Sequence, residues 1–353
     1  MAEKTLMKGN EAIGEAAVKA GCRHYFGYPI TPQSELIEYM AKRLPQIDGV
    51  FVQAESEVAA INMVYGAAGA GARVMTSSSS PGISLKQEGI SYIAGAELPC
   101  VIVNIVRGGP GLGGIQPAQS DYFQATKGGG HGDYRLIVFA SNSVQEMVDT
   151  TTLSFDLADK YRTPVMLLGD GALGQMMEPV EFKDIESKAP EKPWAATGLK
   201  GRSKTNVINS LFLQLDKLET HNHHLQEKYR TIEQNETRWE EMNTEDAELV
   251  LVAYGITSRI AQSAMEKARA AGMKVGLLRP ITVWPFPYAP LAKLAKTAKA
   301  FLSVELSAGQ MVEDVRLGVN GAKPVHFFGR VGGMIPSVQE VYDVIVKTMK
   351  EGK

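Results

Sequence analysis

The sequence predicts an α/β protein with a doubly wound parallel sheet in its first half and a second α/β unit near its end. Short, continuously apolar runs recur through the first 190 residues and are separated by segments of helix length. Such runs are typical of parallel strands that helices cover on both faces. A polar stretch follows, and a strand–helix–strand pattern begins near residue 246. A chain of 353 residues is long enough for two domains.

The first region, residues 1–190, alternates helices and strands. An alanine-rich segment, 10–20, has helical character and stops at Gly21, a residue that often follows a helix. Helical spacing returns at 34–44, after two prolines. Strands are expected at the apolar or β-branched runs 24–28, 50–53, 74–76, 101–106, 136–139 and 165–168.

Residues 191–245 are expected to form a linker that carries a long polar helix. Four leucines recur there at helical intervals, which indicates a long helix or a helical hairpin along the surface: Leu211, Leu215, Leu218 and Leu225. Residues 246–353 then form the second domain. A strand ending at Gly255 is followed by Ser258, a good N-cap residue, and by a helix to about Ala271. Further strands are expected at 274–278, 300–305 and 325–328.

Composition excludes several classes of partner. The formal net charge is −2 and no basic run stands out, so a nucleic-acid partner is not expected. No secretory signal and no apolar stretch of membrane-spanning length is visible, so we expect a cytoplasmic protein without a membrane partner. The two cysteines, Cys22 and Cys100, lie among apolar neighbours and are too few for an iron–sulfur cluster.

The first segment with chemical potential is Tyr28-Pro29-Ile30-Thr31-Pro32, directly after an expected strand. The two prolines restrict the backbone on either side of Thr31. Its hydroxyl is therefore held at the carboxyl end of a strand, where open α/β sheets bind ligands. A stiff loop without a binding role explains the same residues equally well.

Two acidic residues, Glu55 and Glu57, precede a helix of small residues that runs on to Gly71. Acidic residues are common at helix starts for electrostatic reasons alone. A carboxyl entering such an apolar helix is nevertheless expected to be partly desolvated. The hydroxyl cluster at 76–80 lies at another turn from strand to helix, where it forms either an anion site or a plain N-cap.

Arg107 ends a strongly apolar strand and is followed by five glycines in the next seven residues. The glycines permit close approach or movement of the loop. An arginine in this position is suited to hold a carboxylate through two hydrogen bonds, although a structural salt bridge would use it as well.

Two other features are interpreted as structural. Gly169-Asp170-Gly171 resembles the start of a metal motif, but no asparagine occurs between Gly171 and Thr205 to complete it, so we interpret it as a turn. No metal ligand is therefore assigned in this chain. His131, within the glycine-rich run 128–132, is expected on a flexible surface loop.

These segments together resemble the alpha subunits of 2-oxoacid:ferredoxin oxidoreductases. The resemblance is carried by Tyr28-Pro29-Ile30-Thr31-Pro32, by Ser56-Glu57 at the start of a small-residue helix, and by Arg107 at a strand end, in this order. Arg279-Pro280 and the strand ending at Gly255 resemble a transketolase C-terminal-type domain. The stretch through 116–121 is most similar to the branched-chain type, which acts on 3-methyl-2-oxobutanoate, with the 2-oxoglutarate type close behind.

The resemblance implies that the first domain is the pyrimidine-side domain of a thiamine diphosphate site. Glu57 would hydrogen-bond the aminopyrimidine ring nitrogen, with Glu55 as the substitute if the register slips by two. Pro29 and Ile30 would contact the cofactor. Thr31 and Arg107 would bind the carboxylate of the 2-oxoacid. Coenzyme A would be the co-substrate that accepts the acyl group.

The same resemblance implies that this chain works only with partners. A beta subunit would carry the diphosphate and Mg²⁺ half of the cofactor site, and an iron–sulfur subunit or domain with [4Fe-4S] clusters would pass electrons to ferredoxin. Other classes remain open at this point: a 2-oxoglutarate-specific subunit, a subunit of a non-oxidative thiamine-dependent decarboxylase or transferase, or a non-catalytic protein that kept the fold.

Overall fold

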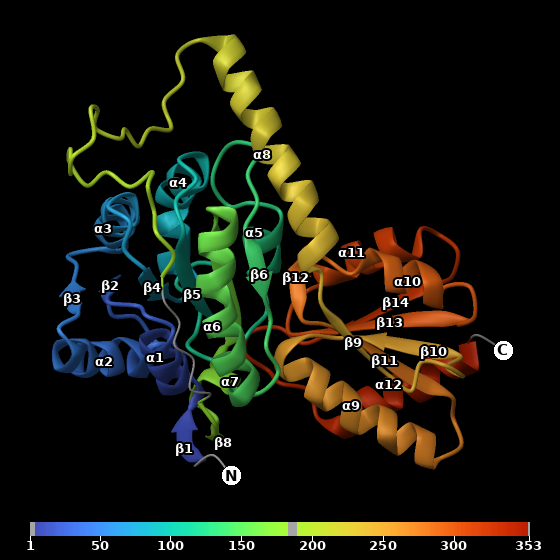
Figure 1. The fold of residues 1–353 in the computed structure, drawn as a ribbon. Coiled ribbons are helices and arrows are strands. Elements are labelled where there is room, and N and C mark those ends of the chain that lie inside the picture. Colours follow the sequence, from blue (N-terminus) through green and yellow to red (C-terminus); the bar gives the residue numbers. More distant parts are fainter. Residues whose placement is uncertain (1–3, 183–188, 352–353) are drawn as a thin grey trace.

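A seven-stranded sheet organises the first half of the chain in the computed structural model, which describes residues 4–182 and 189–351 (Figure 1). Its strands, in spatial order, are β12 (Thr282–Trp284), β6 (Ile137–Phe139), β7 (Pro164–Asp170), β5 (Cys100–Val106), β4 (Val74–Ser78), β2 (His24–Gly27) and β3 (Val50–Gln53). Every neighbouring pair is parallel except β12 with β6. The predicted parallel sheet is therefore confirmed.

Helices cover both faces of this sheet, as a doubly wound fold requires. On one face α1 (Gly9–Lys19) packs between α2 (Ser34–Arg43) and α6 (Val144–Tyr161), whereas α3 (Glu57–Gly69) packs against α4 (Pro81–Gly95). Figure 1 shows α3 and α4 above the strands and α1 and α2 below them. The shorter elements are the 3₁₀ helix η1 (Leu44–Ile47), α5 (Tyr122–Thr126), α7 (Gly171–Gln175) and an antiparallel ribbon of β1 (Thr5–Lys8) and β8 (Met177–Val180).

A second, five-stranded sheet forms from the last third of the chain. Its order is β14 (Val325–Gly329), β13 (Ala300–Glu305), β10 (Leu249–Val252), β11 (Val275–Pro280) and β9 (Trp239–Met242). Only β9 runs antiparallel to its neighbour. The helices α9 (Gly255–Ala270) and α12 (Val338–Glu351) pack together on one side, and α10 (Tyr288–Leu294) and α11 (Met311–Val319) on the other (Figure 1).

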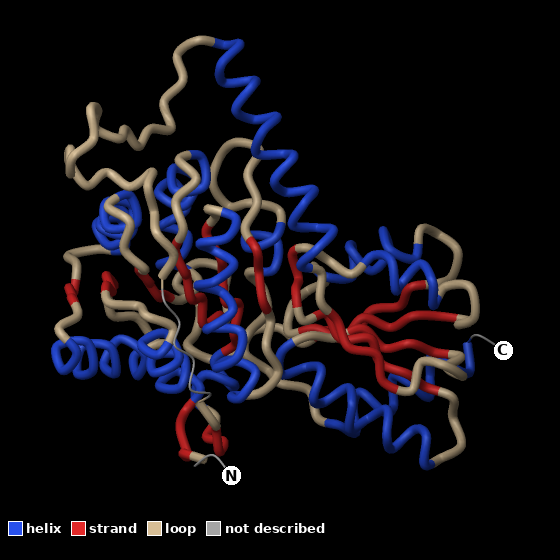
Figure 2. The backbone as a smooth tube through the Cα atoms, in the orientation of Figure 1, coloured by secondary structure: helices blue, strands red, loops and turns tan. Residues whose placement is uncertain are grey.

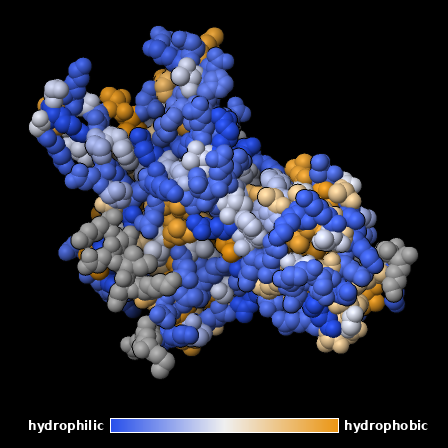
Figure 3. All heavy atoms as spheres, turned by 45° about the vertical axis from the view of Figure 1, so that its right-hand side comes forward, coloured by the Kyte–Doolittle hydropathy of each residue, from blue (hydrophilic) through white to orange (hydrophobic). Residues whose placement is uncertain are grey.

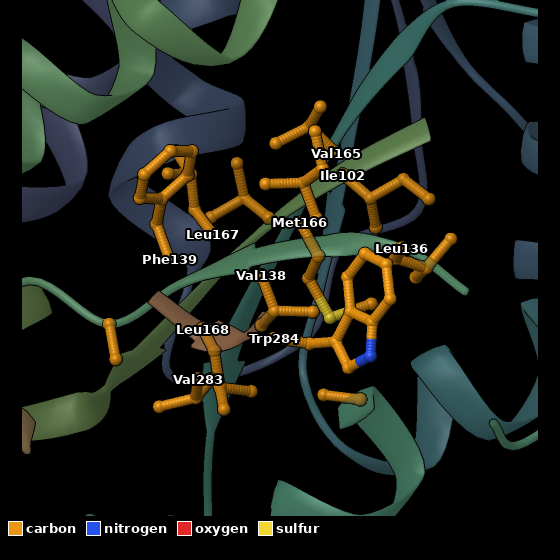
Figure 4. Packing of buried hydrophobic residues seen from close by; sticks show 14 of the residues in the cluster. Ile102, Leu136, Val138, Phe139, Val165, Met166, Leu167, Leu168, Val283 and Trp284 are labelled. Atoms are coloured by element: carbon orange, nitrogen blue, oxygen red, sulfur yellow. The ribbon is translucent and has the colours of Figure 1, made fainter. Parts of the chain in front are cut away.

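The two sheets are joined by a strand that the sequence analysis did not predict. The strand β12 follows β11 in the chain but pairs with β6 of the first sheet, with Trp284 opposite Val138. Figure 4 shows the Trp284 indole among the buried side chains of β6 and β7. The last third of the chain therefore completes the first core.

The polar segment before the second sheet differs in part from its prediction. It contains one long helix, α8 (Leu215–Glu236), whose first turns project from the body of the molecule and whose last turns lie against it (Figure 2). Leu211 was expected in this helix but lies in the preceding extended loop, and the strand β9 was not expected. Leu213 and Leu215 are largely exposed at the projecting end, which Figure 3 shows above a mostly hydrophilic face.

The predicted N-cap of α9 is wrong. The helix begins at Gly255, and the Ser258 hydroxyl donates to the Gly255 carbonyl inside the first turn. The buried N–H of Ile256, in the first turn of the helix, instead donates to the carboxylate of Asp170, from the first sheet. In the part of the chain that the structure describes, no helix is both long and apolar enough to cross a membrane.

Candidate functional site

Glu57 is the first residue of α3 and lies in the interior. Ser56 caps the helix, because its hydroxyl accepts a hydrogen bond of 3.2 Å from the N–H of Ala59. The Glu57 side chain points inward and is only 6% exposed, whereas Glu55 is exposed and accepts from the Ser56 hydroxyl. Of the two acidic candidates, Glu57 alone has the buried position that the sequence suggested.

The carboxyl of Glu57 faces the start of α4 at a glycine. A methyl group built on Gly82 would lie 2.6 Å from Glu57 Oε1 and 2.0 Å from Ser78 Oγ, so only glycine leaves room there. Among the described residues, Glu57 makes no hydrogen bond or ion pair. The hydroxyls of Ser78 and of the adjacent Ser79 are buried and also lack a partner. Buried polar atoms normally have partners, so this group is suited to receive a polar ligand.

Thr31 and Arg107 meet at the carboxyl ends of β2 and β5. Arg107 is 8% exposed, and its Nη1 donates to the Thr31 carbonyl at 3.0 Å while its Nη2 donates to the Leu112 carbonyl at 3.0 Å. Its Nε has no partner within the described chain. Each terminal nitrogen keeps a second N–H, so the guanidinium retains donors for an anion. The Thr31 side chain is exposed at this point.

The loop with Pro29 and Ile30 is tied to the sheet by Gln33. The Ile30 carbonyl accepts from the Gln33 N–H at 3.2 Å, and the side-chain oxygen of Gln33 accepts from Ser77 at 2.5 Å. Pro29 is exposed and Ile30 is half-buried. The loop is therefore fixed beside β4, with Pro29 and Thr31 presented at its surface.

Beside Arg107 a cavity of about 650 Å³ opens between the first sheet and the second unit. The glycine-rich loop after Arg107 forms one wall, and the segments after β13 and β14 form the other. Asp121 lies in the same wall, where burial raises the pKa of its carboxyl and Asn104 donates to it at 2.9 Å. Sequence reasoning did not select Asp121, because nothing in the chain marks its burial.

Lys86 of α4 is the other residue that sequence reasoning missed. It is fully buried, and its Nζ donates to the Thr76 hydroxyl at 2.5 Å. Burial lowers the pKa of Lys86 to about 7, and the nearby Glu57 carboxyl opposes that fall. The one available signal was its position between apolar residues of a helix, Ile83 and Ile90.

Two further residues from the sequence have structural positions. Asp170 caps α7, since its Oδ1 accepts from the N–H groups of Ala172 and Leu173. His131 is exposed in its loop, with its ring against Tyr92 at 5.8 Å between centroids. No group of three or more His, Cys, Asp or Glu side chains suited to a metal ion occurs within residues 4–182 and 189–351.

Comparison with known families covers nearly the whole chain. Residues 15–244 match the family described as "Pyruvate flavodoxin/ferredoxin oxidoreductase, thiamine diP-bdg". Residues 247–341 match "Pyruvate:ferredoxin oxidoreductase core domain II".

Curated relatives are similar over the same extent. The ketoisovalerate oxidoreductase subunit VorB of Methanothermobacter marburgensis is 55% identical, over 95% of this chain and 95% of the relative. The 2-oxoglutarate synthase subunit KorA of Methanothermobacter thermautotrophicus is 36% identical, over 98% of this chain and 99% of the relative. Both relatives are named as subunits of larger enzymes.

Solved structures agree with the fold. A 2-oxoglutarate:ferredoxin oxidoreductase from Magnetococcus marinus, with 2-oxoglutarate, coenzyme A and succinyl-CoA bound, superposes with a TM-score of 0.87 at 27% identity. The match covers 98% of this chain, which spans 65% of that longer one. An inactive tetramer of a split-gene transketolase shares the fold at 13% identity with a TM-score of 0.62.

Proposed function

This chain belongs to the family of 2-oxoacid:ferredoxin oxidoreductase subunits, and we propose that it supplies the pyrimidine side of a thiamine diphosphate site. The complete complex decarboxylates a 2-oxoacid oxidatively, transfers the acyl group to coenzyme A and passes electrons to ferredoxin. The observation that carries the proposal is the buried carboxyl of Glu57, which faces Gly82 beside the Ser78 hydroxyl, a group with no hydrogen-bond partner among the described residues.

The residues around Glu57 fit an aminopyrimidine ring. The carboxyl can exchange a proton with a ring nitrogen, and the Ser78 and Ser79 hydroxyls offer hydrogen bonds to polar groups. When bound, thiamine diphosphate would supply a nucleophilic carbon for the keto group and an electron sink for the electron pair left behind when CO₂ departs. Glu57 would hydrogen-bond the ring nitrogen through its Oε.

Arg107 and Thr31 would bind the carboxylate of the 2-oxoacid. The remaining N–H groups of the guanidinium provide charge-assisted hydrogen bonds, and the exposed Thr31 lies directly beside them. The hydrogen bonds from Arg107 to the Thr31 and Leu112 carbonyls fix the guanidinium before the substrate arrives. Pro29 and Ile30 would contact the cofactor from the same loop.

The loop after Arg107 favours an apolar substrate side chain. Residues 108–120 contain no charged side chain, and Leu112 and Ile115 are 84% and 58% exposed. A second carboxylate, as in 2-oxoglutarate, would find no cation in this loop. We therefore propose 3-methyl-2-oxobutanoate (ketoisovalerate) as the substrate, in agreement with the name of the relative that is 55% identical.

Partner chains would supply the rest of the enzyme. The chain has two cysteines, both buried, and burial raises the pKa of each thiol to about 12. Buried neutral thiols are poor metal ligands, so [4Fe-4S] clusters would lie on an iron–sulfur subunit or domain. A beta subunit would hold Mg²⁺ and the diphosphate, and the cavity beside Arg107 would admit coenzyme A.

The test uses the complex purified with its native partners. Reduction of a low-potential viologen dye should require thiamine diphosphate, a 2-oxoacid and coenzyme A. Glu57→Gln should abolish this reduction, whereas the matched variant Glu55→Gln should retain it. The reverse pattern would show that Glu55 faces the cofactor. A complex with intact clusters and bound cofactor that reduces no dye would refute an oxidative reaction.

Substrate choice is tested in the same assay. The kcat/KM for 3-methyl-2-oxobutanoate should exceed those for 2-oxoglutarate and pyruvate. A preference for 2-oxoglutarate would overturn the assignment of the apolar loop and leave the reaction type unchanged.

A further inference from the structure

We propose that Lys86 is a positioning residue for Glu57. The buried ammonium group of Lys86 determines whether a proton lies on the Glu57 carboxyl or on the bound aminopyrimidine. The inference rests on the proposed function and deepens it. It assigns to this buried lysine a role that acts through Glu57.

The crossing of α3 and α4 places Lys86 near Glu57. Two glycines of α4 face α3: a methyl group on Gly82 would lie 2.6 Å from Glu57 Oε1, and one on Gly89 would lie 2.5 Å from Ile61 Cγ2. Residues four apart on a helix lie on the same face, so Lys86 follows Gly82 along the contact line. Glu57 and Ile61 are themselves four residues apart on α3.

The surroundings of Lys86 compensate little of its charge. Its side chain is fully buried, and its Nζ has two hydrogen-bond acceptors, the Thr76 hydroxyl at 2.5 Å and the Ser77 carbonyl at 3.4 Å. No described carboxylate lies within ion-pair distance of it. A buried ammonium without a paired anion is costly, so its position calls for an explanation beyond packing.

The titratable groups that face Lys86 are few. Among the described residues, Glu57 faces it from α3 and the Cys100 thiol from β5, while β4 contributes the Thr76 hydroxyl and the Ser77 carbonyl. Burial lowers the pKa of Lys86 to about 7, and Glu57 counteracts part of that shift. Burial also raises the pKa of Cys100 to about 12, so this thiol stays neutral near neutral pH.

This arrangement couples two protons. A charged Lys86 favours the ionised carboxylate of Glu57, and therefore favours the state in which the ring nitrogen carries the proton. A neutral Lys86 favours the protonated carboxyl. The proton moves between Glu57 Oε and the ring nitrogen, and Lys86 sets the direction in which that exchange is favourable.

The test is a double-mutant cycle in the purified complex, with Lys86→Met, Glu57→Gln and the double variant. Met has a similar shape and needs no buried partner, and Lys86→Gln serves as the second variant if Lys86→Met does not assemble. Calorimetric binding of thiamine diphosphate is measured between about pH 6 and pH 8, around the pKa of Lys86. Circular dichroism of the bound cofactor reports the amino and imino forms of its ring.

We expect Lys86→Met to change the affinity by about tenfold, to flatten its dependence on pH and to shift the ratio of amino to imino forms. In the Glu57→Gln background the same substitution should have no effect on these readouts. Equal effects of Lys86→Met in both backgrounds, or none in either, would overturn the inference. A wild-type complex that binds no thiamine diphosphate would instead refute the proposed function.

Discussion

The carboxylate of Asp170, at the end of β7, accepts a hydrogen bond of 3.2 Å from the N–H of Ile256 at the start of α9. Its other oxygen accepts from Ala172 and Leu173 at 3.0 and 3.1 Å. One buried side chain therefore caps a helix in each of the two units. The same geometry gives Asp170, in the apparent metal motif, a capping position and explains why Ser258 is not the N-cap of α9.

Asp170→Asn should lower the free energy of unfolding by about 1–3 kcal/mol, because the amide NH₂ cannot accept from Ile256 and leaves a buried donor without a partner. Chemical denaturation measures the change. Asp133→Asn, in an exposed loop, is the matched control and should change stability by less than about 0.5 kcal/mol. Equal effects of the two substitutions would contradict a bridging role for Asp170.

Asp170 also predicts a dependence of stability on pH. Burial raises the pKa of its carboxyl to about 6, above its unfolded value. The folded state therefore holds this proton more tightly, and the contribution is present below the unfolded pKa and lost as pH rises through the folded pKa. Between about pH 5 and pH 7, the unfolding free energy of the wild type should fall by about 1 kcal/mol relative to Asp170→Asn. A constant difference would show that Asp170 does not titrate there.

Ser80 adopts an unusual backbone conformation, with φ 22° and ψ −79°. Its hydroxyl accepts from the Arg107 N–H at 3.1 Å and donates to the Arg107 carbonyl at 3.3 Å. Ser80→Ala loses these bonds and keeps the strain, whereas Ser80→Gly loses the bonds and relieves the strain. In thermal unfolding, the glycine variant should be the more stable of the two by about 1 kcal/mol. Equal stabilities would mean that the conformation costs little.

Gly82→Ala should displace the Glu57 carboxyl, since the added methyl group would overlap Ser78 Oγ and Glu57 Oε1. We expect a loss of about 1–3 kcal/mol in stability and weaker binding of thiamine diphosphate by the complex. Gly95→Ala, on the same helix, is the matched control, because its methyl group would lie an ordinary 3.5 Å from Ser210. If both variants bind the cofactor like the wild type, Gly82 is not part of the site.

The sequence was sufficient to predict the parallel sheet, because strands buried on both faces leave continuous apolar runs such as 101–106. Strand pairing between segments that are distant in the chain leaves no comparable pattern in the sequence. The three-residue strand β12 is too short to show a period, and its partner β6 lies more than a hundred residues earlier. The cap of α9 was missed for the same reason, since Asp170 is distant in the chain.

The residues of the candidate site also fall into those with a local sequence signal and those without one. Glu57, Thr31 and Arg107 lie at a helix start or follow strand ends, where open α/β sheets bind ligands, and the resemblance to a known family then gave each its expected role. Lys86 and Asp121 were not selected, because their interest lies in burial, which depends on how α4 crosses α3 and how the second unit covers the loop. A lysine inside a helix usually indicates an exposed face.

Arg107→Lys separates substrate binding from loop support. Lysine keeps the positive charge but lacks the planar guanidinium. In Arg107 this group donates to the Thr31 and Leu112 carbonyls and still has further N–H groups for a ligand. We expect kcat/KM for the 2-oxoacid to fall roughly 10- to 100-fold, mainly through KM, with the KM for coenzyme A unchanged. Steady-state dye reduction by the purified complex measures both constants.

The control for Arg107 is Arg202, which also donates to loop carbonyls, those of Pro193, Leu199 and Gly198, but lies outside the site. Arg202→Lys should lower the free energy of unfolding about as much as Arg107→Lys does, and should leave the KM for the 2-oxoacid unchanged. Suppose that Arg107→Lys lowers the free energy of unfolding but leaves the KM for the 2-oxoacid unchanged. Arg107 then only holds the loops in place, because substitution of a carboxylate-binding arginine must alter KM. The carboxylate would then be bound by Thr31 and a partner chain.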